Sequence, residues 1–417
     1  NVHSKMGFFA GAHGIPSLLK LSDDGDRRNI ELPYQQVNHF KIISNTQFRQ
    51  GSAHLVSINA GYQINRRKEF SSPHSHGYEP VPEGNLELDF KLQTASLNVD
   101  HQIKNTQNNT FNFGINTEYQ NNSIGGYSFL LPAFSQGTAG LYFFDKYQVS
   151  DKLMANAGLR YDFGLMSISQ FIDPYISIYL SDSILAAKYK VRSPALKRML
   201  NDYSFAIGAV YSVSPKSDIK LNAGKSFRMP TANEFSSNGI HHGTFRHEMG
   251  DSTLHSENSY QLDADIDYRS EIFKVNGGGF INYFPDFIFL NPSGEFSFLP
   301  DAGQIYKYVQ SKAFRVGGEL QIEYRPVKSL KISTVGEVVL ATDLETGYPI
   351  PFTPPLNVIS EAEYDFNDYK FLRNSAISFS WKWVSAQNRV ARNELATDGY
   401  NVFSIAICYY VILGFYS

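Results

Sequence analysis

The chain has 417 residues, a net charge of −3 at pH 7 and only 18% charged residues, so its charge gives no reason to propose a nucleic-acid partner. Aromatic residues are plentiful, with 32 Phe and 26 Tyr, and a single cysteine excludes an intramolecular disulfide bond. No apolar run reaches the ~18 residues that a membrane-spanning helix needs.

Apolar and polar residues alternate in several segments along the chain. In chain order, the clearest segments are Ala157–Phe163, Tyr260–Tyr268, Glu319–Arg325 and Ile377–Trp383. A β-strand points successive side chains to opposite faces, so each segment is expected to form a strand with one apolar face and one polar face. These strands are expected to be longer than the usual five to six residues.

The connections between the expected strands alternate between short and long. Short turns are expected near Arg49–Ser52, Lys104–Asn109, Ser150–Asp151, Ser214–Lys216, Ser270–Ile272, Pro326–Lys328 and Asn367–Tyr369. Long loops are expected near Ala12–Pro33, Ser71–Asn85, Gly125–Gly137, Ser167–Asp202, Met229–Asn258, Asn291–Gly303, Glu345–Pro354 and Ala391–Gly399. Bacterial barrels have short periplasmic turns and longer extracellular loops. The pattern therefore favours an all-β transmembrane antiparallel barrel over a soluble sandwich.

Two local features refine this prediction. Aromatic residues gather at strand ends and are expected to form the girdle at the membrane interfaces, among them Tyr283, Phe284, Phe287, Phe289, Trp381 and Trp383. The basic segment Tyr189–Leu200 is a candidate short helix.

The number and directions of the expected strands are compatible with two kinds of barrel. About sixteen strands are expected, the first around Ser4–Gly11 running outward and the last around Tyr400–Leu413 running inward. A closed sixteen-strand porin fits this count, and so do strands five to twenty of a 22-strand transporter.

Four motifs along the chain occur in the same order as in a known family. Gly224–Glu234 resembles the FRAPTxxEL stretch of TonB-dependent outer-membrane receptors, and Gly243–Glu257 resembles the element that opens the next inward strand of that family. Asn156–Asp162 resembles a recurrent strand signature, and Asp398–Ser404 resembles a late GYTLFN strand.

The resemblance implies that residues 1–417 form one partial receptor barrel in the bacterial outer membrane. About four strands would precede Asn1, and about two would follow Ser417. The N-terminal plug domain, and with it the contact with the TonB complex, would lie outside this chain. Outer-membrane lipid is the other expected partner. No catalytic motif such as G-x-S-x-G or H-E-x-x-H occurs, so no enzymatic activity and no required cofactor are expected.

Histidines in two long loops are the candidate metal ligands. One loop carries four of them and the other carries two: His241, His242, His247 and His255, then His74 and His76. Imidazole is a common ligand of zinc and related ions. The resemblance adds that haem receptors place a ligating histidine in the first of these loops, and that zinc-uptake receptors carry histidine-rich loops. A bound Zn²⁺ or haem would be the transported ligand, and the alternative is that the histidines are solvated loop residues.

Arg228 and Arg246 are candidate contacts for an anionic ligand such as a haem propionate or a ferric chelate. The alternative for Arg228 is a strand-end residue paired with a neighbouring carboxylate. The resulting hypothesis is an outer-membrane receptor for TonB-dependent uptake of a zinc-like metal ion or haem. A ferric-siderophore receptor is the first alternative, and a passive porin or adhesin-type barrel is the second.

Overall fold

The computed structural model describes residues 9–10, 16–17, 32–73, 81–174, 182–241, 246–299, 302–366 and 372–411. Within these ranges long β-strands dominate, and none of the helices has the length and apolar character to cross a membrane.

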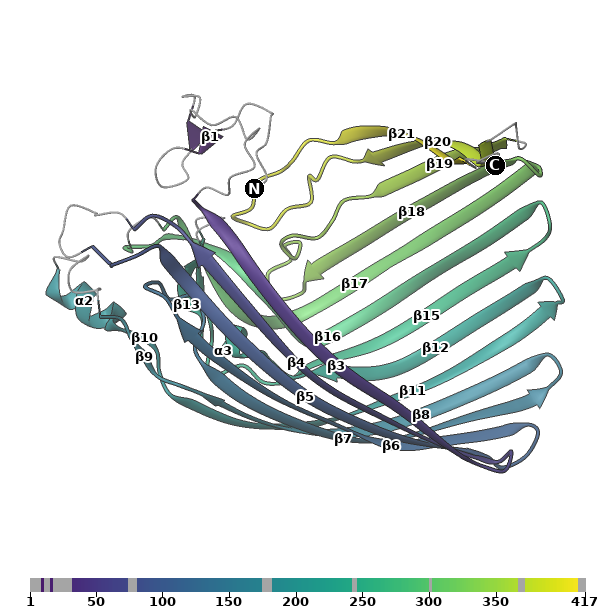
Figure 1. Cartoon of the computed structure of the whole chain (residues 1–417), viewed down its shortest axis with the longest axis horizontal. Coiled ribbons are helices and arrows are strands. Elements are labelled where there is room, and N and C mark those ends of the chain that lie inside the picture. The colour runs from purple at the N-terminus through teal and green to yellow at the C-terminus, as the bar shows by residue number, and fades with distance from the viewer. Residues whose placement is uncertain are drawn as a thin grey trace, which may run out of the picture.

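The long strands are antiparallel and wind around one barrel, which Figure 1 shows from the side. The first eight are β3 (Tyr34–Gln50), β4 (His54–Phe70), β5 (Leu86–Lys104), β6 (Asn109–Gly125), β7 (Phe134–Ser150), β8 (Leu153–Ile168), β11 (Leu196–Ser214) and β12 (Ser217–Arg228). The others are β15 (Glu257–Arg269), β16 (Phe273–Phe296), β17 (Gln304–Val327), β18 (Leu330–Asp343), β19 (Asn357–Phe366), β20 (Leu372–Val384) and β21 (Tyr400–Val411). This confirms the predicted all-β barrel.

The register gathers the apolar side chains on one face of the sheet. Leu262 of β15 lies opposite Ile281 of β16, which lies opposite Val316 of β17. Val316 in turn lies opposite Leu340 of β18. Leu262, Ile281 and Leu340 are between 42% and 52% exposed, which a soluble protein would avoid over so wide a band. This face is the one that a bilayer would cover.

The opposite face carries ion pairs between neighbouring strands. Lys274 Nζ lies 2.9 Å from Glu323 Oε1, and Lys331 Nζ lies 2.9 Å from Glu363 Oε1. Each pair joins residues that are direct partners in the register, so the two side chains leave the sheet on the same side. Charged pairs on this face and apolar side chains on the other reproduce the alternation seen in the sequence.

The short turns lie at one end of the barrel and the longer connections at the other (Figure 1). The turn expected at Pro326–Lys328 lies slightly later, because β17 ends at Val327 and β18 begins at Leu330. The turn expected at Asn367–Tyr369 lies outside the described residues. Of the expected first strand, only Phe9–Ala10 (β1) is described, and it pairs with Pro16–Ser17 (β2) in a separate sheet.

The long connection between β8 and β11 contains a helix, but not where the sequence predicted one. Helix α2 spans Ser183–Lys190, and Asp182 caps it by accepting hydrogen bonds from two backbone N–H groups. The expected helix at Tyr189–Leu200 was wrong for most of its length, because β10 (Val191–Ser193) and the start of β11 occupy it. β10 pairs with β9 (Phe171–Ile172).

The expected aromatic girdle is only partly present. Trp381 and Trp383 belong to the apolar face, and Trp381 Nε1 donates a 2.8 Å hydrogen bond to Asn401 Oδ1. Phe284, however, is 5% exposed and packs against Phe287 with ring centroids 4.8 Å apart. A register shift between these two residues changes the alternation, so they meet in a buried cluster and not in a girdle.

Candidate functional site

The connection between β12 and β15 folds into small elements at the long-loop end of the barrel. It contains α3 (Ala232–Ser236), β13 (Asn238–His241) and β14 (Arg246–Met249). A capping box between Thr231 and Glu234 begins α3, and Phe235, 2% exposed, anchors the helix in an apolar cluster. β14 then pairs with β17 in parallel. The connection is therefore fixed to the barrel wall over much of its described length.

Arg228 sits where this connection leaves β12, and two carboxylates hold its guanidinium. Its Nε and Nη2 atoms donate to the two oxygens of Glu257, each at 3.0 Å, and Nη1 donates to Glu234 Oε2 at 2.9 Å. Burial lowers the pKa of Arg228, but the bonds to Glu234 and Glu257 outweigh it and raise the pKa above its usual value. Arg228 is therefore a strand-end residue paired with two carboxylates, and its contact with an anionic ligand stays a prediction.

His247 in β14 is fully buried. Its Nδ1 lies 2.8 Å from Ser297 Oγ, and its Nε2 lies 2.8 Å from Asn238 Oδ1. The carbonyl oxygen of Asn238 can only accept, so the ring proton belongs on Nε2. Burial, with the Arg192 guanidinium as a second cause, lowers the pKa of His247 to about 4. With no exposure and both ring nitrogens engaged, this histidine has the environment of a structural residue that joins three loop segments.

His255 is exposed and lies beside a carboxylate. Its Nε2 is 3.2 Å from Asp286 Oδ1, and its Nδ1 contacts Gln310 Oε1. Gln310 also donates to the backbone oxygens of His255 and Asp286, at 3.0 and 2.9 Å. The side-chain amide thus holds the histidine and the carboxylate together, and the His255 side chain remains 64% exposed. An exposed imidazole next to a carboxylate is a pair that a divalent cation can bind.

Arg246 in β14 lies against two aromatic rings. Its guanidinium carbon is 5.2 Å from the centre of the Tyr306 ring and 5.3 Å from the centre of the Phe352 ring. These two rings stack on each other with their centroids 6.1 Å apart. Phe352 is 53% exposed. A guanidinium held by cation–π contacts beside an exposed ring can meet an anionic, planar ligand.

The other candidate histidines are described only in part or not at all. His242, His74 and His76 are outside the described residues, and of His241 only the backbone is described, paired with Arg246. Over the described ranges, no group of three or more His, Cys, Asp or Glu side chains could hold a metal ion. That these loop histidines bind a metal ion therefore stays a prediction.

Three residues that contact His255 or Arg246 were not predicted from the sequence: Asp286, Gln310 and Tyr306. One signal was available for Asp286, because a proline inside a strand pattern marks a bulge, and Pro285 precedes it in β16. Gln310 and Tyr306 lie in β17, far along the chain from the loop that they contact, so no local pattern points to them.

Comparison with known families and structures gives one family and one fold. A family model described as "TonB dependent receptor-like, beta-barrel" matches residues 16–416. The fold is similar to a structure titled "Copper transporter OprC", with a TM-score of 0.72 and 14% identity, covering 90% of this chain and 57% of that chain. The ferric yersiniabactin uptake receptor FyuA from Yersinia pestis gives a TM-score of 0.61 at 11% identity, covering 90% of this chain and 54% of that one.

A third similar structure is the FrpB iron transporter from Neisseria meningitidis in its F3-3 variant, with a TM-score of 0.62 and 13% identity. The match covers 89% of this chain and 56% of that one. The chain therefore spans a little more than half the length of the solved structures that it matches.

Proposed function

This chain belongs to the TonB-dependent receptor family, and we propose that it serves the active uptake of a metal ion or metal chelate across the bacterial outer membrane. The family is one of transport receptors and not of enzymes, and its barrels lie in the outer membrane. Loops at the long-loop end would bind the cargo from outside the cell. Energy would come from the TonB complex through a plug domain inside the barrel.

The pair formed by the exposed His255 and the half-buried Asp286 is the observation that supports a metal-containing cargo. The pair supplies one nitrogen and one oxygen donor, and zinc in proteins is usually four-coordinate. Donors from the histidines outside the described residues, or from a chelate, would complete the coordination. The cargo that we propose first is a zinc-like divalent ion or haem. The structural relatives titled as copper and iron transporters belong to the same broad class of cargo.

A ferric siderophore is the second candidate, and Arg246 is the observation that favours it. Ferric chelates are often anionic and carry aromatic rings, and the guanidinium lies against Tyr306 and the exposed Phe352. Such a chelate would stack on Phe352 while its charge meets Arg246. The relative titled as a ferric yersiniabactin uptake receptor is one reason to include this class.

The cargo is tested by titrating the full-length receptor with Zn²⁺, with haemin and with a ferric catecholate in isothermal calorimetry. We expect one of them to bind saturably. His255→Ala should weaken Zn²⁺ or haemin binding at least tenfold, because the loss of even an outer-shell partner of a metal ligand typically costs about ten- to a hundredfold in affinity. Arg246→Gln should weaken the ferric catecholate instead.

The matched control is His101→Ala, because His101 lies near the short-turn end of β5, away from the candidate site. Saturable binding that neither His255→Ala nor Arg246→Gln weakens would overturn this site. A receptor that binds none of the three ligands and conducts ions freely in a planar bilayer would favour a passive porin.

A further inference from the structure

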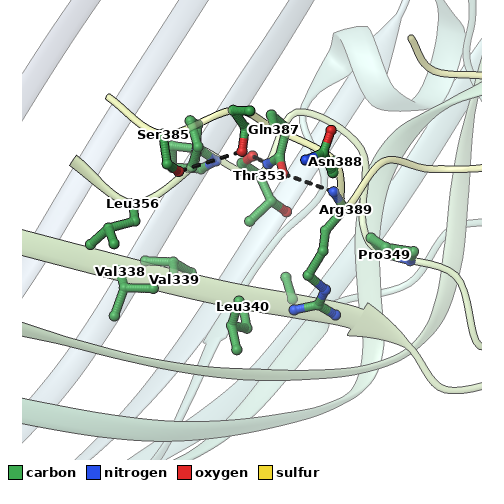
Figure 2. A pocket seen from close by; sticks show the side chains of 14 residues that line it. Val338, Val339, Leu340, Pro349, Thr353, Leu356, Ser385, Gln387, Asn388 and Arg389 are labelled. Atoms are coloured by element: carbon green, nitrogen blue, oxygen red, sulfur yellow. Dashed lines mark hydrogen bonds between the residues drawn. The ribbon is translucent and has the colours of Figure 1, made fainter. Parts of the chain in front are cut away.

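Two loops at the long-loop end of the barrel are joined to each other. One is the β18–β19 loop (residues 344–356), and the other is the β20–β21 loop (residues 385–399). The side chain of Gln387 donates a hydrogen bond to the backbone oxygen of Thr353, and Figure 2 shows these two residues close together. Asn393, at the tip of the second loop, donates a 3.0 Å hydrogen bond to a backbone oxygen of β16. The β20–β21 loop is therefore fixed both to its neighbour and to the barrel wall.

Phe352 in the β18–β19 loop has a backbone conformation that a bulky side chain disfavours. Its φ is +60°, in the left-handed region, where such a residue is strained. Asn374 is the other non-glycine residue with a positive φ in the described ranges, and asparagine tolerates this region far better. A strained residue persists only where its surroundings hold it, and such residues gather at ligand-binding positions. The contacts of Phe352 therefore indicate its role.

Glu394 in the β20–β21 loop holds the backbone of Phe352. Its Oε1 accepts a 2.8 Å hydrogen bond from the N–H of Phe352, and its Oε2 accepts a 2.9 Å hydrogen bond from the N–H of Ala391. Hydrogen bonds to a carboxylate are roughly twice as strong as neutral ones. Ala391 is buried, and so are Ile350 and Pro351, which precede Phe352. Phe352 is thus held between a buried segment of its own loop and a carboxylate of the neighbouring loop.

The ring of Phe352 belongs to the Arg246 site. It stacks on Tyr306 with an interplanar angle of 21°, and the Arg246 guanidinium lies 5.3 Å from its centre. Phe352 nevertheless remains 53% exposed, whereas Ile350, two residues earlier, is 5% exposed. An aromatic side chain that is half exposed beside a cation can stack on a further ring that carries anionic substituents. Packing of the loop alone gives no reason to leave this ring exposed.

We propose that Glu394 is a positioning residue that fixes the Phe352 ring as a preformed stacking surface for an aromatic, anionic chelate. The inference rests on the proposed function and assigns part of its cargo preference to a residue that does not itself contact the cargo. A ring that is fixed before the cargo arrives lowers the entropic cost of binding. A carboxylate this close to an anionic cargo repels it, so Glu394 favours binding only through Phe352.

The test is a double-mutant cycle of ferric catecholate binding, measured by calorimetry on the full-length receptor. Phe352→Ala should weaken binding about tenfold, the upper end of what one aromatic stacking contact contributes. Glu394→Ala should weaken it about threefold, because the ring is present but no longer held. The double variant should bind no more weakly than Phe352→Ala, since Glu394 acts through that ring. The matched control is Glu345→Ala, which removes an exposed carboxylate from the β18–β19 loop and should leave the affinity unchanged.

A second measurement tests the strained backbone without any cargo. Glycine is unstrained at a φ near +60°, whereas alanine is not. The β18–β19 loop should therefore be better protected from hydrogen–deuterium exchange in Phe352→Gly than in Phe352→Ala, the reverse of the usual order. In the Glu394→Ala background this difference should shrink, because the loop is then free to relax.

The outcomes separate this proposal from the proposed function. Additive losses in the double variant, or an unchanged affinity in Glu394→Ala, would overturn the positioning role and leave uptake of an aromatic chelate standing. Equal losses in Glu394→Ala and Glu345→Ala would show a general effect of charge and overturn it too. Equal protection of Phe352→Gly and Phe352→Ala would show that the backbone is not held under strain. A parent receptor that binds no ferric catecholate would remove the aromatic cargo class, and this proposal with it.

Discussion

Acidification should open the loop that contains His247, because this residue is buried in its neutral form. In the folded loop the pKa of His247 is about 4, below its ordinary value of 6.5. A histidine with a depressed folded pKa contributes its full stability above pH 6.5. That contribution falls as the pH drops from 6.5 towards 4, since the open loop takes up a proton that the closed loop cannot.

The loss of loop stability on acidification can be calculated from the difference between the pKa of His247 in the closed loop and in the open loop. Each pKa unit corresponds to about 1.4 kcal/mol, so the free energy of opening should fall by about 3 kcal/mol between pH 7 and pH 4. Protection of the backbone amides in β13 and β14 should drop about tenfold for each pH unit below 6.5. The segments affected are those joined by the ring, which are Asn238–His241, Arg246–Met249 and the residues around Ser297.

Hydrogen–deuterium exchange with mass spectrometry, corrected for the intrinsic pH dependence of exchange, measures this directly. His247→Gln is the matched variant, because glutamine hydrogen-bonds without titrating in this range. Its loop should be less protected at pH 7 but should show no added loss at pH 5. If the parent loop kept its protection down to pH 4, or if His247→Gln lost protection in parallel with the parent, the burial argument would be refuted.

Two further perturbations test other parts of the structure. Arg228→Ala leaves Glu234 and Glu257 without their cation and should destabilise the connection after β12 by about 2–3 kcal/mol. This cost is lower than for a fully buried pair because the Arg228 side chain is 38% exposed. Hydrogen–deuterium exchange in α3 would measure the loss of stability, and unchanged protection of α3 would contradict the prediction. Leu262→Arg on the apolar face of β15 should lower the free energy of unfolding of the bilayer-inserted barrel by about 2–4 kcal/mol, as measured by denaturant titration. Asp263→Arg on the polar face should lower this free energy much less, and equal losses in the two variants would contradict the assignment of faces.

The strands were predictable because their signal is local. In Tyr260–Tyr268 the alternation alone assigns Leu262 and Ile266 to the apolar face, and the structure exposes both on it. The bulge at Phe284 and Phe287 was not predicted, because one inserted residue moves a side chain to the other face without changing the composition. The helix at Ser183–Lys190 was missed because its apolar residues do not form a clear stripe, and its position depends on the capping bond to Asp182.

The candidate site was less predictable than the barrel. The sequence places His247 and His255 in one loop, but it cannot show that the first is buried against Ser297 and that the second is exposed beside Asp286. Both environments depend on contacts with residues more than thirty positions away along the chain. Arg228 was closer to prediction, because a strand-end arginine beside acidic residues commonly forms an ion pair.

Active uptake of a metal ion or metal chelate by this protein is tested most directly by transport in living cells. Cells that carry the full-length gene would be given radiolabelled zinc, haem iron or a ferric catecholate, with the TonB complex either intact or removed. We expect saturable accumulation of one cargo, abolished when TonB is removed and reduced by His255→Ala or Arg246→Gln according to the cargo. Accumulation of none of the three, or accumulation that proceeds equally without TonB, would contradict the claim.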